Sequence, residues 1–446
     1  MALLIRDAEI DGRRRDVLVR DGRIAAGPPD RPCEVLDAAG GALLPGLTDH
    51  HLHLHALAAA RLSVDAGRSR DDLAAALGRA TPDGSGWIRA VGSSDDRLDA
   101  RGLDLLRPDA PVRVQHRSGA MWVLNTAALS ALAALGGLDH PGVERGPGGV
   151  PTGRILRADD WLRARLPAGG LPDLTAVGHE LAGHGITAVT DATPDLAPEA
   201  AVALTAVPQR LTLLGVPLGS APPPGATAGP YKIVLADSGL PGLDELTDRI
   251  RAAHAVGRPV AVHSVTVESL VLLLAALDDA GRQQGDRIEH AALVPRELLE
   301  RLAGLAVVTQ PGFLTDRGDR YRREVPAAEH PDLYRCRSLR DNGIAVALSS
   351  DAPYGPVDPW AVLRAATTRL TPDGAPLGPD EALTPTTALG ALLAPTPGAA
   401  PRALRPGTPA DLVLLHTPLA EALRAPDHGL VRTTFVAGVP ISGDVV

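Results

Sequence analysis

The residues with the clearest chemical potential lie in one short run, Asp49-His50-His51-Leu52-His53. A Pro45-Gly46 corner precedes the run, which is typical of the start of a strand. Side chains two residues apart in a strand point to the same face, so Asp49, His51 and His53 should lie together. Neutral imidazole binds zinc and other transition metals, and we therefore interpret His51 and His53 as candidate ligands. The alternative is a histidine-rich turn that binds no metal.

Further candidate ligands occur within or at the ends of apolar, strand-like runs later in the chain. Lys232 lies inside such a run, whereas His263, His290 and Asp351 each end one. In a barrel of parallel strands, the catalytic side chains come from the carboxyl ends of several different strands. We therefore predict one metal centre built from these four residues together with His51 and His53.

Lys232 has a second peculiarity, because it is the single lysine among 44 basic residues. A buried lysine beside a metal should lose its proton, whereas arginine stays charged. The neutral amine of Lys232 can take up carbon dioxide, and the resulting carbamate would be an oxygen ligand able to bridge two metals. The rival hypothesis is an unmodified lysine that contacts substrate or lies behind a single metal.

The elements that must position these residues follow a repeated order. Between residues 47 and 399, strand-like runs alternate with helical stretches rich in Ala, Leu and Arg, which favours an α/β fold of repeated βα units. We predict seven strands, at residues 47–53, 185–191, 231–235, 259–263, 286–290, 306–310 and 344–351.

The second strand of the barrel should lie between residues 54 and 184. Both Trp87–Gly92 and Pro111–His116 qualify, and neither is preferred. This connection is longer than one βα unit needs, so we expect it to carry an insertion that shapes the pocket.

Short apolar runs separated by turns near both chain ends predict a second, smaller domain. Leu3–Ile5 and Val17–Val19 are such runs at the beginning, and Leu412–Leu415 and Val431–Val436 are their counterparts at the end. The runs at the beginning cannot close a core alone. We therefore expect a small β-sandwich domain of residues 1–46 plus 400–446, and a catalytic domain of residues 47–399.

Composition limits the class of partner. The net charge is −9, the basic residues are scattered, and no run approaches the length of a membrane span, so we expect neither nucleic acid nor membrane as a partner. Only Cys33 and Cys336 are present, which is too few for a disulfide framework. We expect a cytoplasmic protein that acts on a small-molecule substrate. The sequence leaves its oligomeric state open, including a homodimer.

The run Pro45–His53 resembles the first-strand signature of the metal-dependent amidohydrolase superfamily. This resemblance implies a distorted (β/α)8 TIM-type barrel with metal at the carboxyl ends of its strands, and a carboxylated lysine in binuclear members. The chain is most similar to the amidohydrolase family 3 branch, which is YtcJ-like and N-substituted formamide deformylase-like. The supporting stretches are His116–Asn125, Ile288–His290, Thr309–Pro311 and Ser349–Pro353. The chain departs from the branch at Ala120 and at Thr266-Val267, in loops that should face substrate.

These observations predict a metal-dependent hydrolase that cleaves a C–N bond, in an amide or a cyclic amide, of a small molecule. A metal-activated hydroxide would be the nucleophile, and Asp351 would act as general acid and base. The expected cofactor is a divalent metal, with zinc as the first expectation, as one or two ions, together with carboxylation of Lys232 by CO2.

Four residues are candidates for substrate contact, namely His116, Arg117, Trp122 and Asn125. Trp122 and Asn125 have an alternative role in packing and capping. Two other functions stay open: lactone hydrolysis, decarboxylation or isomerisation on the same metal barrel, and a binding protein without catalysis.

Overall fold

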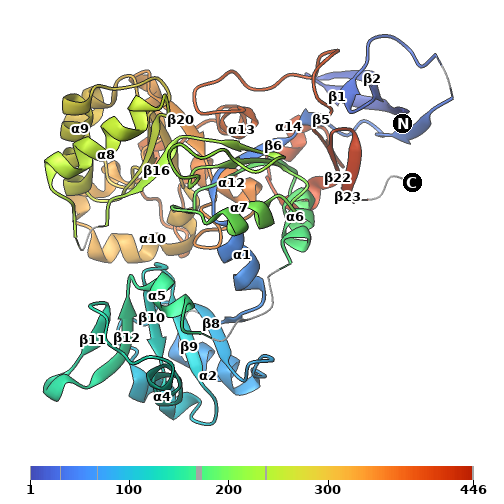
Figure 1. Ribbon diagram of the computed structural model, residues 1–446. Coiled ribbons are helices and arrows are strands. Elements are labelled where there is room, and N and C mark those ends of the chain that lie inside the picture. Colours follow the sequence, from blue (N-terminus) through green and yellow to red (C-terminus); the bar gives the residue numbers. More distant parts are fainter. Residues whose placement is uncertain (1, 31, 68, 167–172, 237–238, 444–446) are drawn as a thin grey trace. The chain divides into compact units, whose positions relative to one another are not determined.

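The computed structural model describes residues 2–30, 32–67, 69–166, 173–236 and 239–443. The chain forms two compact units (Figure 1). Unit 1 consists of Met1–Leu54 and Leu174–Val446, and unit 2 consists of His55–Asp173. Among the described residues, none of the helices combines the length and the apolar character needed to cross a membrane.

Two sheets of parallel strands form the centre of unit 1, in the orders β15-β14-β13-β6 and β16-β17-β18-β19-β20. The strands are β6 (Leu47–Leu52), β13 (Ile186–Asp191), β14 (Arg210–Leu213), β15 (Ala226–Ala228), β16 (Tyr231–Val234), β17 (Val260–Ser264), β18 (Arg287–His290), β19 (Ala306–Thr309) and β20 (Ala345–Leu348). Backbone bonds join the two sheets on both sides. Lys232 N donates to Leu214 O at 3.2 Å, and Asp351 N donates to His51 O at 2.8 Å.

All seven predicted strands are present, although β20 ends at Leu348, so that Asp351 follows the strand by three residues. The predicted position of the second strand is wrong. β13 pairs in parallel directly with β6, and the next strand in the sheet is β14, which was not predicted. Both earlier candidates form strands, but β8 (Ile88–Ser93) and β9 (Val112–His116) belong to the sheet of unit 2. The order of strands in a sheet depends on long-range pairing, which a local pattern does not encode.

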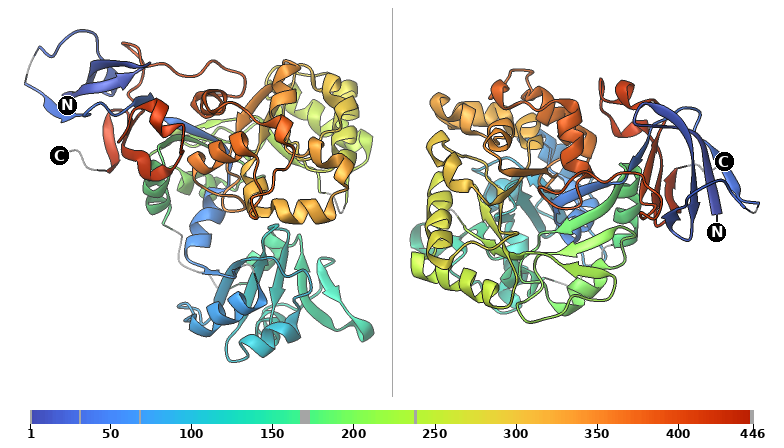
Figure 2. Two further views of the ribbon diagram at one scale, coloured as in Figure 1. Left: turned by 180° about the vertical axis from the view of Figure 1, so that it is seen from behind. Right: turned by 90° about the horizontal axis from the view of Figure 1, so that it is seen from above.

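Helices cover the parallel strands on the outside (Figure 2). They are α6 (Leu174–Gly183), α7 (Pro198–Leu204), α8 (Leu243–Ala255), α9 (Val267–Ala280), α10 (Gly312–Glu324), α11 (Arg337–Asp341), α12 (Pro359–Thr368) and α13 (Pro385–Leu393). In α9, a capping box between Thr266 and Ser269 starts the helix directly after the loop that follows β17. Leu270, Leu273 and Leu277 from this helix join the core against the strands.

The two chain ends form a pair of four-stranded sheets, β3-β2-β1-β4 and β23-β22-β21-β5. Their strands are β1 (Ala2–Ile10), β2 (Arg13–Arg20), β3 (Arg23–Ile24), β4 (Glu34–Asp37), β5 (Leu43–Pro45), β21 (Leu412–Leu415), β22 (Val431–Val436) and β23 (Val439–Gly443). Ile5 and Leu36 of one sheet share a core with Leu412 and Phe435 of the other. The expected association of the two ends is therefore present.

Unit 2 is built on a six-stranded sheet of order β11-β12-β10-β9-β8-β7. Besides β8 and β9, it contains β7 (Val64–Asp65), β10 (Met121–Leu124), β11 (Val143–Arg145), β12 (Pro151–Leu156), α2 (Arg70–Arg79), α3 (Ala100–Leu106), α4 (Thr126–Ala134) and α5 (Asp159–Arg163). It has its own apolar clusters, one including Leu73 and Val112 and another including Leu132 and Ile155. The predicted insertion is thus a compact unit, and its part in shaping a pocket stays a prediction.

Candidate metal centre

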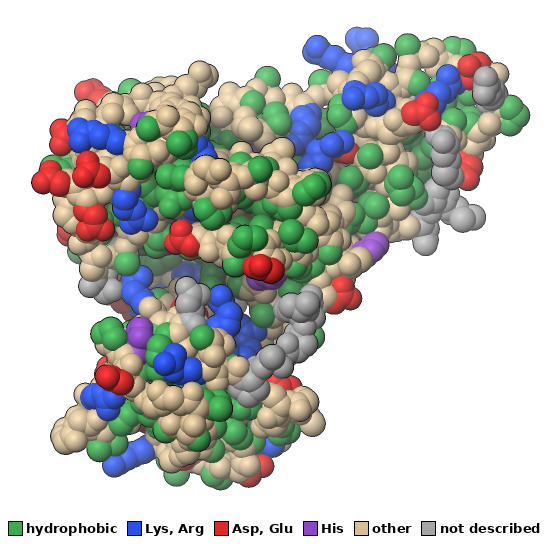
Figure 3. Space-filling view, in the orientation of Figure 1, with side chains coloured by type: hydrophobic (Ala, Val, Ile, Leu, Met, Phe, Trp, Pro, Cys, Tyr) green, Lys and Arg blue, Asp and Glu red, His purple; other side chains and the backbone are tan. Residues whose placement is uncertain are grey.

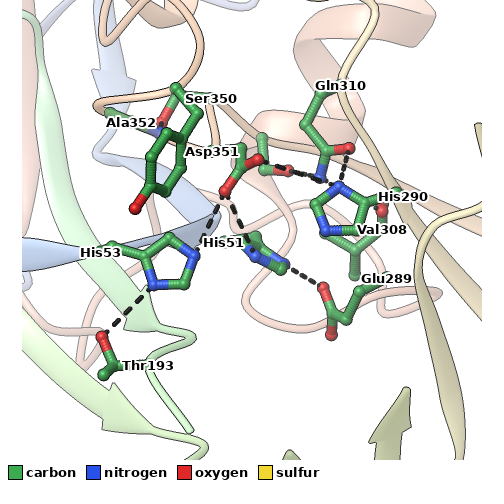
Figure 4. Close-up of polar contacts among 12 residues, drawn as sticks. His51, His53, Thr193, Glu289, His290, Val308, Gln310, Ser350, Asp351 and Ala352 are labelled. Atoms are coloured by element: carbon green, nitrogen blue, oxygen red, sulfur yellow. Dashed lines mark hydrogen bonds and ion pairs between the residues drawn. The ribbon is translucent and has the colours of Figure 1, made fainter. Parts of the chain in front are cut away.

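Three predicted ligands meet where β6 ends. His51 is the second-last residue of β6, His53 directly follows that strand, and Asp351 comes from the loop after β20 (Figure 4). One ligand atom from each of the three lies within 4.8 Å of the others. The Nε2 atoms of His51 and His53 are 3.5 and 3.4 Å from Asp351 Oδ1. A carboxylate therefore stands between two imidazoles at one end of the parallel strands.

The other three predicted ligands lie beside this cluster. The His290 ring is 4.8 Å from that of His51 and 4.3 Å from that of His263, measured between centroids. His290 Nδ1 is 3.9 Å from Asp351 Oδ2. Lys232 is buried on β16, next to the strand that carries His263, and its charge acts on both His51 and His290. The structure thus brings the four predicted histidines and Asp351 together, with Lys232 buried on the strand next to that of His263.

The electrostatics of the centre favour neutral nitrogen ligands. Burial, together with the nearby Lys232, holds the pKa of His51 well below its usual value. Burial and the neighbouring His263 do the same to the pKa of His290. Burial also lowers the pKa of Lys232, although the carboxylates of Glu289 and Asp351 oppose the shift. Neutral imidazole is the form of histidine that binds a metal.

Two buried polar atoms without hydrogen-bond partners test whether these residues could hold a metal ion. Among the described residues, His51 Nε2 and Asp351 Oδ1 have no hydrogen-bond partner, although each is shielded from solvent. An unsatisfied buried polar atom costs stability, and a divalent ion between this nitrogen and this oxygen would satisfy both. Imidazole and carboxylate are ligand types that zinc accepts, so the residues fit.

Residues behind the ligands orient two of the histidines, and the sequence reasoning did not assign them this role. The Glu289 carboxylate accepts a short hydrogen bond from His51 Nδ1 and a second from Arg287 Nε at 2.6 Å. Gln310 Oε1 accepts the Nδ1 hydrogen of His290 at 2.9 Å. Metal-binding histidines commonly donate their second nitrogen in this way. The available signal was a pair of charged residues, Arg287 and Glu289, at alternate positions of a buried strand.

Asp49, which shares the face of the two β6 histidines, has a structural role. Its Oδ1 accepts the backbone N–H groups of His51 at 3.1 Å and Ser350 at 3.2 Å, and so ties β6 to the loop after β20. Burial raises the pKa of Asp49 to about 6, although the hydrogen bonds from Ser350 and His51 lower it.

Few histidines appear on the molecular face in Figure 3, and His51 and His290 are buried.

The backbone at two ligands is unusual. His290 has φ 72° and Asp351 has φ 54°, which is the left-handed region that residues other than glycine seldom occupy. The residue after His290, Ala291, has φ 45°. Such conformations cost free energy and cluster at functional sites, where the surrounding structure enforces them.

The four predicted substrate contacts all belong to unit 2. His116 Nε2 is 3.2 Å from Asp96 Oδ1, and Trp122 Nε1 donates to Asp159 Oδ1 at 2.9 Å. The Arg117 backbone N–H donates to Ser93 O. Asn125 is fully buried, caps α4, and donates to the carbonyl oxygens of residues 107 and 110. Its side chain is therefore occupied by a structural role.

Comparison with known proteins finds relatives in sequence and in fold. The chain is 27% identical to N-substituted formamide deformylase from Arthrobacter pascens, over 84% of this chain and 83% of that protein. Two solved structures share the fold. An uncharacterized metal-dependent hydrolase from Pyrococcus horikoshii OT3 aligns with TM-score 0.72 and 21% identity, over 97% of this chain and 99% of its own. N-isopropylammelide isopropylaminohydrolase from Burkholderia multivorans ATCC 17616 aligns with TM-score 0.54 and 17% identity, over 100% of this chain and 99% of its own.

Family membership rests on a match that spans most of the sequence. The model of the amidohydrolase family, Amidohydro_3, matches residues 34–442. This range includes every candidate ligand and implies a TIM-barrel-like α/β fold, in agreement with the parallel sheets of unit 1. The chain belongs to the amidohydrolase family and is a hydrolase that acts on carbon–nitrogen bonds.

Proposed function

We propose that this protein is a metal-dependent hydrolase that cleaves the C–N bond of an amide or cyclic amide in a small molecule. The observation that carries the proposal is the pair of buried, unsatisfied atoms, His51 Nε2 and Asp351 Oδ1, 3.5 Å apart. In this proposal the protein binds one or two divalent metal ions, and zinc is the metal that we expect. The proposed ligands are His51, His53, Lys232, His263, His290 and Asp351.

The proposed architecture is a distorted (β/α)8 barrel of residues 47–399 and a β-sandwich domain of residues 1–46 and 400–446. Backbone bonds that link the two parallel sheets on both sides support closure of the barrel. The core shared by the two end sheets supports the sandwich.

The residues of the centre have separate roles in the proposed reaction. When bound, the metal lowers the pKa of a water molecule and polarises a carbonyl group. Asp351 takes the proton of the attacking water on a carboxylate oxygen and passes it to the leaving nitrogen. Glu289 fixes the ring of His51 through the Nδ1 hydrogen, and Gln310 does the same for His290.

We propose that Lys232 is carboxylated. Its side-chain nitrogen attacks the carbon of CO2 and releases one proton, which leaves a carbamate anion in place of the amine. Lys232 is buried, and its side chain forms no hydrogen bond or ion pair with any residue that the structure describes. A buried ammonium without a partner is costly, whereas a carbamate oxygen would be a metal ligand.

His116, Arg117 and Trp122 remain proposed substrate contacts. Asn125 is the weakest of the four, because its amide already bonds within unit 2.

Metal analysis and a substrate panel test the proposed function. Protein from zinc-supplemented medium should contain at least one equivalent of metal and should hydrolyse the amide or cyclic amide bond of some small molecule in the panel. Chelation should abolish turnover, and zinc should restore it. His51→Gln should lose metal, whereas His254→Gln should keep it, because His254 pairs with Asp286 outside the centre. Turnover of lactones but not of amides, or metal far below one equivalent, would contradict the proposal.

A further inference from the structure

Aromatic side chains are scarce in this chain and unevenly placed. The sequence contains two phenylalanines and four tyrosines. Four of these six Phe and Tyr residues meet in a single cluster of unit 1, which also contains several aliphatic side chains. Two of these, Val265 and Leu293, are only partly buried like Tyr321 and Tyr354. We call this group the aromatic wall, and its members are Val265, Leu293, Phe313, Tyr321, Tyr334 and Tyr354.

The aromatic wall has a rigid base. The Tyr334 ring lies 5.8 Å from both Phe313 and Tyr321, and the two tyrosine hydroxyls are 2.9 Å apart. The Arg317 guanidinium stacks on Phe313 at 4.0 Å and donates a short hydrogen bond to Tyr354 O. Ring pairs at such distances are favourable beyond the area they bury. The arrangement therefore holds its shape without a ligand.

Most of the wall comes from loops that follow the strands of the metal centre. Val265 follows β17, Leu293 follows β18, and Tyr354 follows β20 by six residues. Phe313 lies in the first turn of α10, directly after β19. In parallel barrels these loops surround the substrate. The segments that follow four successive strands thus contribute apolar side chains to the wall.

The wall reaches the metal centre through Tyr354. Its ring meets the His53 ring edge to face at 5.6 Å, and its backbone N–H donates to Asp351 O at 2.8 Å. Tyr354, Tyr321, Val265 and Leu293 are only partly buried, whereas Phe313 and Tyr334 are buried behind them. An apolar surface that is partly open and adjoins the candidate ligands is suited to an apolar part of the substrate.

We propose that the aromatic wall binds an uncharged, ring-sized apolar group of the substrate next to the cleaved C–N bond. This inference rests on the proposed function. The cation beside the wall, Arg317, also donates a hydrogen bond to the Asp316 carboxylate at 3.3 Å. Its charge is therefore already paired, and the wall should not attract a carboxylate of the substrate. The substrate class is therefore amides with an aromatic or comparably large apolar substituent, rather than small or acidic amides.

A matched set of amides and variants tests the inference. Acetamide, phenylacetamide and succinamate share the reacting amide but differ in the substituent. We expect kcat/KM for phenylacetamide to exceed that for the other two by at least roughly tenfold, and we expect Tyr354→Ala to remove most of this difference. Tyr231→Ala is the control, because Tyr231 packs against the main core and not the wall. It should retain the preference.

Equilibrium binding separates this inference from the proposed function. Calorimetry with phenylacetamide on the Asp351→Asn protein, in which turnover should be nearly lost, should show binding, and the added change Tyr354→Ala should weaken this binding roughly tenfold. If no amide is hydrolysed but the loss of binding with Tyr354→Ala is found, the proposed function is wrong and the inference about the aromatic wall is supported. If amides are hydrolysed and acetamide or succinamate is preferred, or if Tyr354→Ala keeps the preference, the inference is wrong. Leu293→Gln serves as the second variant if Tyr354→Ala does not fold.

Discussion

Replacement of Glu289 by glutamine tests whether the residues behind the ligands set the affinity for metal. The Glu289 carboxylate is fully buried and accepts hydrogen bonds from His51 Nδ1 and Arg287 Nε. Glutamine keeps the shape of the side chain but removes its charge. The bond that orients His51 becomes weaker, and the Arg287 guanidinium, only 6% exposed, is left without its buried anion.

Two different losses should follow. Removal of a partner behind a metal ligand typically lowers metal affinity by roughly 10- to 100-fold. Breaking a buried ion pair typically costs about 3–5 kcal/mol in the free energy of unfolding. The double variant Glu289→Gln/Arg287→Met removes both charges, so it should recover part of the stability. It cannot restore the carboxylate that His51 needs, so its zinc affinity should stay low.

Competition between metal-free protein and a chromophoric chelator measures the zinc affinity, and urea unfolding measures the stability. Glu300→Gln is the control, because Glu300 is exposed and should change neither quantity. Zinc affinity of Glu289→Gln within about threefold of the wild type would refute the reasoning, since that is well below the expected loss. Recovery of zinc affinity together with stability in the double variant would refute it too, because the effect would then act through the fold alone.

Three further predictions follow from other residues. Lys232→Arg should lose the carbamate and, with it, the second metal. Elemental analysis measures the metal, and the carbamate signal in 13C NMR after exposure to labelled bicarbonate measures the modification; an unchanged signal would contradict the carboxylation. Asp351→Asn should keep the fold, shown by circular dichroism, and most of the metal, but lose roughly 10²- to 10⁴-fold in kcat. Burial raises the pKa of Glu381, but hydrogen bonds from Ser338 and Arg335 outweigh it and lower the pKa overall. A lowered carboxyl pKa stabilises the fold above the unfolded value of 4.5 and ceases to do so as the pH falls through the folded value. The difference in thermal midpoint between the wild type and Glu381→Gln should therefore shrink below about pH 4.5.

The positions of the candidate ligands could be predicted from sequence because each has a local signature. His51 and His53 share a strand face, and His263 and His290 end apolar runs. The period of two in strands and the position at a strand end are short-range properties. Placing six residues in one centre then required only the assumption that the strands are parallel neighbours.

The order of the strands could not be predicted in the same way. The segments that form β8 and β9 have apolar patterns at least as clear as that of β14, whose four residues are Arg-Leu-Thr-Leu. Only the register of β13 against β6 and β14 decides which segments enter the parallel sheets. Register is fixed by the buried faces of a complete sheet, so it has no signature within one segment.

The hydrogen bonds behind the ligands share this limit. Glu289 lies 238 residues from its partner His51, and nothing near either residue indicates the other. The left-handed backbone of His290 and Asp351 is likewise imposed by surrounding structure, since neither residue type prefers it. A sequence pattern therefore indicates the candidate ligands but not the residues that orient them.

Compositional bias makes the exceptions in this chain informative, but only when their position is known. The single lysine is buried in the centre, and four of six Phe and Tyr residues form the aromatic wall. The other two show the limit of the argument. Phe435 is fully buried in the core of the end sheets, and Tyr231 stacks with Arg258, so packing explains both. Rarity alone thus marks a residue that arginine or an aliphatic side chain cannot replace. It indicates chemistry when the rare side chain itself lies beside the candidate ligands, as Lys232 does with His51 and as the Tyr354 ring does with that of His53.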